Sequence, residues 1–126
     1  MIIDSSAVVA ILRDEPEAAD FRRLIEASDA VAISAATLVE VSMVVGPARQ
    51  AVLDRFLVAS GAMVVPVDEE QVSVARGAAI RFGRGSGSPA RLNFGDCFSY
   101  ALASVTERPL LCKGNDFVHT DLELAR

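Results

Sequence analysis

Four short apolar runs, separated by longer segments with helical spacing, constrain the fold of this chain most strongly. They cover residues 1–3, 31–33, 63–65 and 110–112. Short apolar runs that alternate with helices are typical of a parallel sheet with helices on both faces. We therefore expect an α/β fold, a three-layer α/β/α sandwich around a short central parallel sheet of four to five strands. The tail from Phe117 suits either a last short strand or a helix.

Capping residues and apolar periodicity indicate where the helices lie. Ser5 can cap the first helix, Pro16 suits the first turn of the second, and Asp68 opens a capping-box pattern before the fifth. The Gly-Pro pair at 46–47 ends or kinks the third helix, because the residue before a proline disfavours helical geometry. The expected helices run from 5 to 12, from 16, from 34 or 37, from 48 to 59, from 68, and from 93 to 105.

Size and composition suit one globular domain, residues 1–126. A chain of 126 residues with 52% hydrophobic content can bury a substantial core. This apolar fraction lies slightly above the usual ~45–50%, which hints at self-association or a protein partner. The longest apolar stretch, residues 7–12, is far shorter than the ~20 residues that cross a bilayer, so no membrane role is expected. Cys97 and Cys112 fit no zinc or disulfide pattern and are expected as buried free thiols in a reducing cytoplasm.

The charge of the chain is acidic overall but unevenly distributed. A net charge of −5 argues against a broad basic surface for nucleic acid. No Asp or Glu occurs between Gln71 and Gly95, however, and this is where several arginines lie. They are Arg76, Arg81, Arg84 and Arg91. Residues 83–90, rich in glycine and serine, are expected to form a mobile loop.

Four acidic residues follow or flank the predicted strands and indicate a metal site. Asp4 directly follows the first strand and Asp116 follows the last, so both belong at the carboxyl edge of the sheet, where the crevice of such folds lies. Glu40 and Asp96 lie on helices that can project into the same crevice. Mg²⁺ prefers oxygen ligands, would relieve the mutual repulsion of the carboxylates and would activate water at a phosphorus centre.

Each of these acids also has a structural explanation when it is considered alone. Asp4 could cap the following helix, and Glu40 could close a capping box with Thr37. Asp96 near a helix start is favoured by the helix dipole, and Asp116 in a Gly-Asn-Asp turn suits turn chemistry. Their common location, not any single position, favours the metal site.

The segments around these acids resemble the four sequence motifs of PIN domains. The matching segments are residues 2–7, 34–41, 92–97 and 110–117, in the family's order and spacing. The resemblance covers essentially the whole chain and implies a PIN-like α/β/α fold. Because the chain is small and carries no extra domain, it is most similar to the VapC-type toxins of type II toxin–antitoxin pairs.

This resemblance implies a Mg²⁺-dependent endoribonuclease, with Mn²⁺ as a substitute ion. Asp4 and Asp96 would be the principal metal ligands, Glu40 would orient water or complete the shell, and Asp116 would support the site or a second metal. Ser6 would hydrogen-bond within the acidic cluster. Asn115 would orient Asp116, although turn chemistry explains it equally well. The family also implies a homodimer and a cognate antitoxin whose C-terminal segment occupies the cleft.

Three basic residues are candidates for RNA contacts, with ordinary solvated charge as the alternative. Arg84 and Arg91 flank the glycine–serine loop, and Lys113 adjoins the fourth motif. Side chains of this kind bind phosphates without selecting sequence.

Two other functions compete with the toxin ribonuclease. A catalytically silent PIN module that binds RNA or protein would not need all four acids. A Mg²⁺ phosphatase or phospho-acceptor domain needs a second acid beside the first-strand aspartate, but Ser5 and Ser6 occupy those positions. Which RNA would be cut is not encoded in any motif.

Overall fold

A short parallel sheet lies at the centre of the computed structural model, which describes residues 1–126. Its strand order is β3-β2-β1-β4, and every pairing is parallel. The strands are β1 (Ile2–Ile3), β2 (Ala32–Ser34), β3 (Met63–Val65) and β4 (Leu110–Leu111). The α/β architecture and the four-strand core of the prediction are therefore confirmed.

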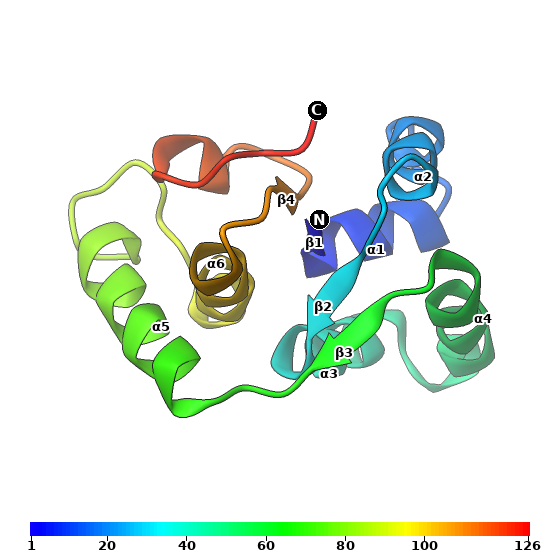
Figure 1. Cartoon of the computed structure of the whole chain (residues 1–126), viewed down its shortest axis with the longest axis horizontal. Helices are drawn as coiled ribbons and strands as arrows, with labels where there is room; N and C mark the ends of the chain where they lie inside the picture. Colours follow the sequence, from blue (N-terminus) through cyan, green and yellow to red (C-terminus); the bar gives the residue numbers. More distant parts are fainter.

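Six α-helices and two 3₁₀ helices surround this sheet (Figure 1). The α-helices are α1 (Ser5–Leu12), α2 (Ala18–Glu26), α3 (Ala35–Val45), α4 (Gln50–Ser60), α5 (Glu69–Phe82) and α6 (Phe94–Thr106). The 3₁₀ helices are η1 (Pro47–Arg49) and η2 (Asp116–His119). In Figure 1, α5 and α6 lie on one side of the sheet, and α1, α2 and α4 lie on the other. None of the helices combines the length and apolar character that crossing a membrane requires.

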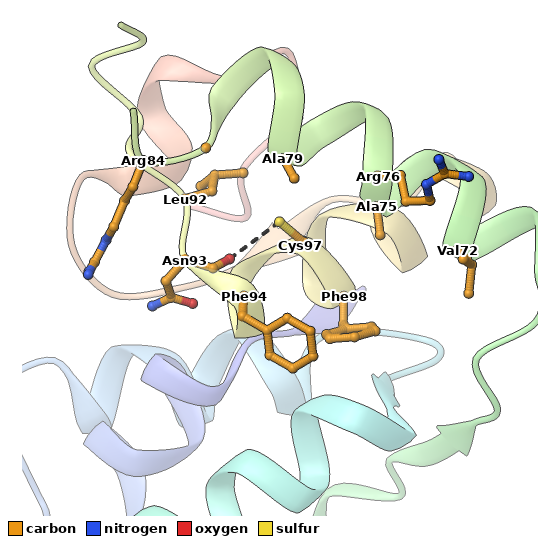
Figure 2. A pocket seen from close by; sticks show the side chains of 11 residues that line it. Val72, Ala75, Arg76, Ala79, Arg84, Leu92, Asn93, Phe94, Cys97 and Phe98 are labelled. Atoms are coloured by element: carbon orange, nitrogen blue, oxygen red, sulfur yellow. Dashed lines mark hydrogen bonds between the residues drawn. The ribbon is translucent and has the colours of Figure 1, made fainter. Parts of the chain in front are cut away.

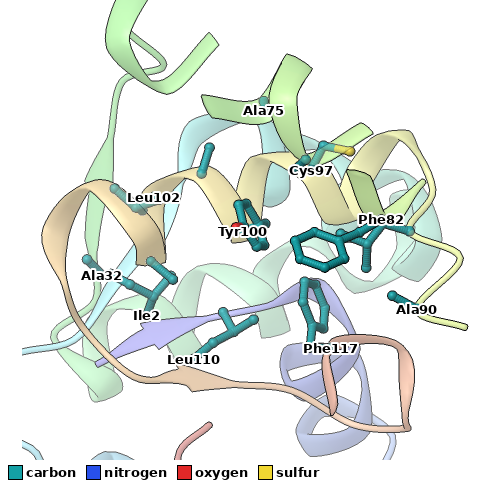
Figure 3. Close-up of a cluster of buried hydrophobic side chains, with 14 residues drawn as sticks. Ile2, Ala32, Ala75, Phe82, Ala90, Cys97, Tyr100, Leu102, Leu110 and Phe117 are labelled. Atoms are coloured by element: carbon teal, nitrogen blue, oxygen red, sulfur yellow. The ribbon is translucent and has the colours of Figure 1, made fainter. Parts of the chain in front are cut away.

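Two separate hydrophobic clusters pack against the two faces of the sheet. Ile2 and Leu110 are partners in the ladder and contribute to the cluster on the α5–α6 side (Figure 3). Ile3 and Leu111, the next pair, contribute to the cluster that includes α1, α3 and α4. Successive strand residues point to opposite faces, so two residues per strand are enough to anchor both layers. This arrangement confirms the predicted three-layer sandwich.

Several helix boundaries differ from the predictions. The cap of α1 is Asp4 and not Ser5, because the Asp4 carboxylate accepts the Ser6 N–H. Helix α2 begins at Ala18 without a side-chain cap, two residues after Pro16. The Gly-Pro pair ends α3 as predicted: Gly46 has φ +75° and Pro47 opens η1, which delays α4 to Gln50.

The ambiguous tail forms a short 3₁₀ helix and one isolated bridge, and not a fifth strand. It first turns through η2 and then returns to the sheet edge, where Leu124 forms an isolated parallel bridge with Leu110. The Leu110 N–H donates to the Glu123 carbonyl at 2.9 Å, and the Ala125 N–H donates to the Leu110 carbonyl at 2.9 Å. The tail thereby covers the edge of β4, which would otherwise expose unpaired backbone groups.

The glycine–serine segment forms a loop that is closed at its base. A bridge joins Gly83 to Leu92, with the Leu92 N–H donating to the Phe82 carbonyl at 2.9 Å. Gly85 and Gly87 adopt φ values of +84° and +85°, which side-chain-bearing residues rarely adopt. The base of this loop is therefore tied between α5 and α6. Its predicted mobility remains a prediction.

Candidate active site

Asp4 lies where β1 turns into α1, with its carboxylate held by three hydrogen bonds. Its backbone N–H donates to the Leu111 carbonyl at 2.9 Å, which fixes it at the carboxyl end of β1 beside β4. Carboxylate oxygen Oδ2 accepts from the Ser6 N–H at 2.9 Å and from Ser6 Oγ at 2.6 Å. Oxygen Oδ1 accepts from Ser99 Oγ at 2.6 Å. Asp4 is only 2% exposed, so the structure fixes both the position and the orientation of its charge.

Two buried hydroxyl residues that the sequence analysis missed support this carboxylate. Ser99, which donates to Asp4, lies 3.1 Å from Thr37 between their hydroxyl oxygens. Ser99 is three residues after Asp96 on α6, and Thr37 is three residues before Glu40 on α3. Residues three apart share one helix face, so a hydroxyl at this spacing from each acid, inside a mainly apolar helix, was the available signal.

Asp96 lies in the first turn of α6, where it forms a capping box with Asn93. The Asn93 N–H donates to Asp96 Oδ2 at 2.8 Å, and the Asp96 N–H donates to Asn93 Oδ1 at 2.9 Å. The structure thus gives Asp96 a capping role in addition to the favourable position in the helix dipole, but the capping box accounts for only one of the two carboxylate oxygens. The chain donates no hydrogen bond to Oδ1, which remains available to a ligand.

The pKa of Asp96 connects the four acids. It is raised to about 6, chiefly because burial disfavours the charged carboxylate, while the hydrogen bond from the Asn93 backbone lowers it. The negative charges of Asp4, Asp116 and Glu40 raise it further. Burial, together with the charges of Asp4, Asp116 and Asp96, raises the pKa of the Cys112 thiol to about 12. The other three predicted acids therefore lie close enough to Asp96 to act on its carboxylate electrostatically.

Glu40 reaches this site from α3. Its carboxylate accepts a hydrogen bond from Ser5 Oγ and lies against the backbone of Gly95, where an added Cβ would overlap it. The alternative explanation of Glu40, a capping box with Thr37, is wrong, because α3 begins at Ala35 and Thr37 contacts Ser99 instead. Glu40 therefore belongs to the contact between α1, α3 and α6, and not to a helix cap.

Asp116 is the exposed member of the group and opens η2. The turn before it requires φ +90° at Gly114, which explains the glycine. The Asn115 side chain does not cap η2. Ser6 Oγ accepts the Lys113 N–H at 2.9 Å, so the same hydroxyl that holds Asp4 also ties the end of β4 to the site.

The residues fit a hard divalent cation that keeps part of its water shell. The atoms available as metal ligands are carboxylate oxygens, which Mg²⁺ prefers. Asp96 offers one oxygen that accepts no hydrogen bond from the chain. No group of three or more His, Cys, Asp or Glu side chains is arranged to hold a metal as it stands. A cation with few direct protein ligands, completed by water and substrate phosphate, agrees with both observations.

The three predicted RNA-contacting residues differ in their surroundings. Lys113 Nζ lies 2.5 Å from Glu15 Oε2 and 3.2 Å from Glu17 Oε2, so its charge is already compensated. These two ion pairs raise the pKa of Lys113. Arg84 and Arg91 are exposed and form no ion pair within the chain. Both cysteines are free thiols as predicted, although only Cys97 is fully buried.

Comparison with known proteins gives consistent sequence matches. A family model described as PIN domain matches residues 1–123. Ribonuclease VapC28 of Mycobacterium tuberculosis is 47% identical over 129 residues, covering 99% of this chain and 97% of that protein. Ribonuclease VapC30 of the same organism is 41% identical over 126 residues, covering 97% and 95%.

Two solved structures share the fold at low sequence identity. The first is Mycobacterium tuberculosis VapC20, described as a Sarcin-Ricin loop cleaving toxin. It has a TM-score of 0.72 at 17% identity, covering 99% of this chain and 98% of that one. The second, a toxin–antitoxin complex from Klebsiella pneumoniae, also has a TM-score of 0.72, at 16% identity, covering 95% and 92%.

Proposed function

Because this chain belongs to the PIN domain family, we propose that it is a Mg²⁺-dependent endoribonuclease and the toxin of a type II toxin–antitoxin pair. The observation that carries the proposal is that Asp4, Glu40 and Asp116, from three other parts of the chain, all lie close enough to raise the pKa of Asp96. Helix α6, which bears Asp96, also contacts Asp4 through Ser99 and Glu40 through Gly95. The names of the relatives that are 41–47% identical, all VapC ribonucleases, support the same activity.

In this proposal, Asp4 and Asp96 would hold the cation, and Mn²⁺ could replace Mg²⁺. The bound ion would activate water and stabilise negative charge at the attacked phosphate. Asp4 contributes a carboxylate whose orientation is set by Ser6 and Ser99. Asp96 contributes its unbonded Oδ1. Asp116, at the exposed rim, supports the site.

Glu40 orients the attacking water. Ser5 and the Gly95 backbone fix its carboxylate beside the start of α6. The oxygen of water forms the new bond to phosphorus and the water releases a proton, while the bond from phosphorus to the 3′ oxygen breaks and that oxygen takes up a proton. The products are a 5′-phosphate and a 3′-hydroxyl.

Arg84 and Arg91 bind RNA phosphates near this site, because their charges have no partner within the chain. Lys113 reaches RNA only where a phosphate replaces Glu15 and Glu17 as its partner. Electrostatic contacts of this kind give affinity without sequence selection.

The partners in this proposal are RNA, a second copy of the chain and a cognate antitoxin, all in the cytoplasm. Helix α3 leaves Val39, Met43 and Val44 exposed, at 60%, 79% and 47%. A helix face of this kind supports self-association, because exposed apolar patches mark interaction surfaces. Size-exclusion chromatography with light scattering tests the dimer: the wild type should elute with the mass of a dimer, and Met43→Asp with the mass of a monomer.

The test of the catalytic proposal uses the purified chain and a structured RNA. We expect cleavage with Mg²⁺ and with Mn²⁺, none in excess EDTA, and a rate at least ~10³-fold lower for Asp96→Asn. Arg55→Ala, an exposed change on α4, should cleave at the wild-type rate. Sequencing of the new 5′ ends identifies the RNA and the site that is cut. RNA binding without metal-dependent cleavage would favour the silent PIN module, and wild-type cleavage in EDTA would exclude the metal mechanism.

A further inference from the structure

A groove beside the acidic site is not used by the chemistry described above. It has a volume of about 580 Å³ and runs between α5 and α6 (Figure 2). Its floor is apolar and includes Ala75, Ala79, Leu92 and Cys97. A volume of this size lies within the ~300–1,000 Å³ range of sites that hold small organic groups.

One wall of the groove carries an exposed aromatic residue. Phe94, the first residue of α6, is 82% exposed. Phe98 lies one turn later and holds the Phe94 ring edge-on, with ring centroids 4.9 Å apart and an interplanar angle of 83° (Figure 2). The contact with Phe98 limits how the Phe94 ring can move, while its remaining surface faces solvent. A large, supported and exposed aromatic ring is suited to stacking against a flat ligand.

Two arginines without partners in the chain line the groove. Arg76 and Arg84 are exposed lining residues that form no salt bridge and donate no side-chain hydrogen bond within the chain. In contrast, Arg81, which lies on α5 with Arg76, pairs with Asp121 at 2.7 Å. No acidic residue occurs from 72 to 94, and neither groove arginine is paired with a carboxylate from elsewhere in the chain. The groove therefore complements an anion with an apolar, flat body.

The groove is directly connected to the acidic site. Asn93 lines the groove and exchanges two hydrogen bonds with Asp96, the proposed metal ligand. Phe94 lies two residues before Asp96 in the same first turn of α6. A ligand in the groove therefore lies next to a phosphate held at the carboxylates.

From these contacts we propose that the α5–α6 groove binds a nucleobase of single-stranded RNA next to the cleaved phosphate. The base stacks on Phe94, and Arg76 and Arg84 contact the phosphates that flank it. This inference rests on the proposed ribonuclease function, because RNA combines the flat apolar body with the regularly spaced anions that the groove complements.

The test measures RNA binding separately from cleavage. A fluorescein-labelled single-stranded oligoribonucleotide is titrated with the protein in excess EDTA, and anisotropy gives the Kd. Phe94→Ala and Phe94→Leu should each weaken binding by about 10-fold, and Phe94→Trp should retain it, because stacking contributes about 1–3 kcal/mol per base. Arg76→Ala and Arg84→Ala should weaken binding and reduce its salt dependence.

Matched controls lie on α4, away from the groove. Val58 is 84% exposed and Arg55 is exposed, so Val58→Ala and Arg55→Ala change comparable surface residues and should leave the Kd unchanged. Circular dichroism of every variant checks that the fold is retained. A 2-aminopurine base in the RNA should lose fluorescence on binding to the wild type and not to Phe94→Leu.

The failure of this inference differs from the failure of the ribonuclease proposal. If the wild type cleaves RNA with a rate that depends on Asp96, but Phe94→Leu has the same Kd and KM as wild type, the groove does not bind RNA. If the groove binds an acidic peptide and the oligoribonucleotide does not compete, the inference is also wrong. If binding depends on Phe94 but no cleavage occurs with Mg²⁺, the groove site stands and the catalytic proposal fails.

Discussion

A buried aspartate lies at the start of both α1 and α6: Asp4 is the N-cap of α1, and Asp96 forms the capping box of α6 with Asn93. The two carboxylates nevertheless have different surroundings. Asp4 accepts hydrogen bonds at both oxygens from Ser6 and Ser99. Asp96 accepts a single bond, from the backbone of Asn93, and its pKa is raised to about 6. Hydrogen-bond donors stabilise an ionised carboxylate, and burial without them destabilises it.

This difference indicates separate contributions to one site. Asp4 is part of the folded framework, because its hydroxyl partners connect β1, α1, α3 and α6. Asp96 retains an unbonded oxygen and an unfavourable charge, which a cation would stabilise. Predictions that replace one aspartate and spare the other therefore test the contrast, beginning with the largest effect.

Replacing Asp4 with alanine should cost about 2–3 kcal/mol of folding stability. The change removes the cap of α1 and leaves the hydroxyls of Ser6 and Ser99 without their acceptor. Urea denaturation at neutral pH measures the loss. Asp68→Ala is the matched control, because Asp68 caps α5 through one bond to Gln71 N–H and should cost only about 1 kcal/mol. Equal losses for both variants would show that the hydroxyl network adds nothing.

Asp96→Asn should have the opposite sign and stabilise the metal-free protein by roughly 1–2 kcal/mol at pH 7.5. Because the folded pKa of Asp96 is about 6, above its ordinary value of 3.8, the folded state holds a proton that the unfolded chain releases. The stabilisation from that proton is fully present below about pH 4 and is lost as pH rises through 6. The stability difference between wild type and variant, measured by urea denaturation in EDTA, should therefore vanish near pH 4. A difference that does not change with pH would contradict the raised pKa.

Mg²⁺ should stabilise the wild type by about 1.4 kcal/mol at a concentration ten times its Kd. The cation binds the ionised carboxylates, so the increase in Tm should be larger at pH 7.5 than at pH 5. Asp96→Asn should lose most of this increase, and Asp54→Asn, a change on the exposed surface of α4, should keep it. A Tm increase that persists in Asp96→Asn would place the cation elsewhere.

Ser99→Ala should have the smallest effect, a loss of about 1 kcal/mol, because it removes one bond to Asp4 and the contact with Thr37. It should also weaken the Mg²⁺-induced increase in Tm, since Asp4 loses an orienting partner. Ser104→Ala on the same helix, whose side chain makes no hydrogen bond within the chain, is the control for helix stability. If the two variants respond equally to Mg²⁺, Ser99 has no positioning role.

The local features of this fold could be predicted because short-range chemistry sets them. The apolar runs predicted the four strands, and the Gly-Pro pair at 46–47 predicted the end of α3. Asp4 was the informative exception, since both Asp4 and Ser5 can cap a helix and the sequence alone favoured the wrong one. In the structure Asp4 caps α1, and the Ser5 hydroxyl donates to Glu40, 35 residues away.

The sequence by itself determined the elements, the two apolar faces of each strand and the four acids that follow or flank the strands, because periodicity and capping act over a few residues. Only the tertiary structure decided the strand order, the hydrogen bond from Ser99 to Asp4 across 95 residues, and the pairing of Lys113 with Glu15 and Glu17. It also decided that Phe94 and two unpaired arginines lie along one groove. Such contacts depend on how whole layers pack, and no local pattern specifies which distant side chains meet when a sheet and its helices close around a common core.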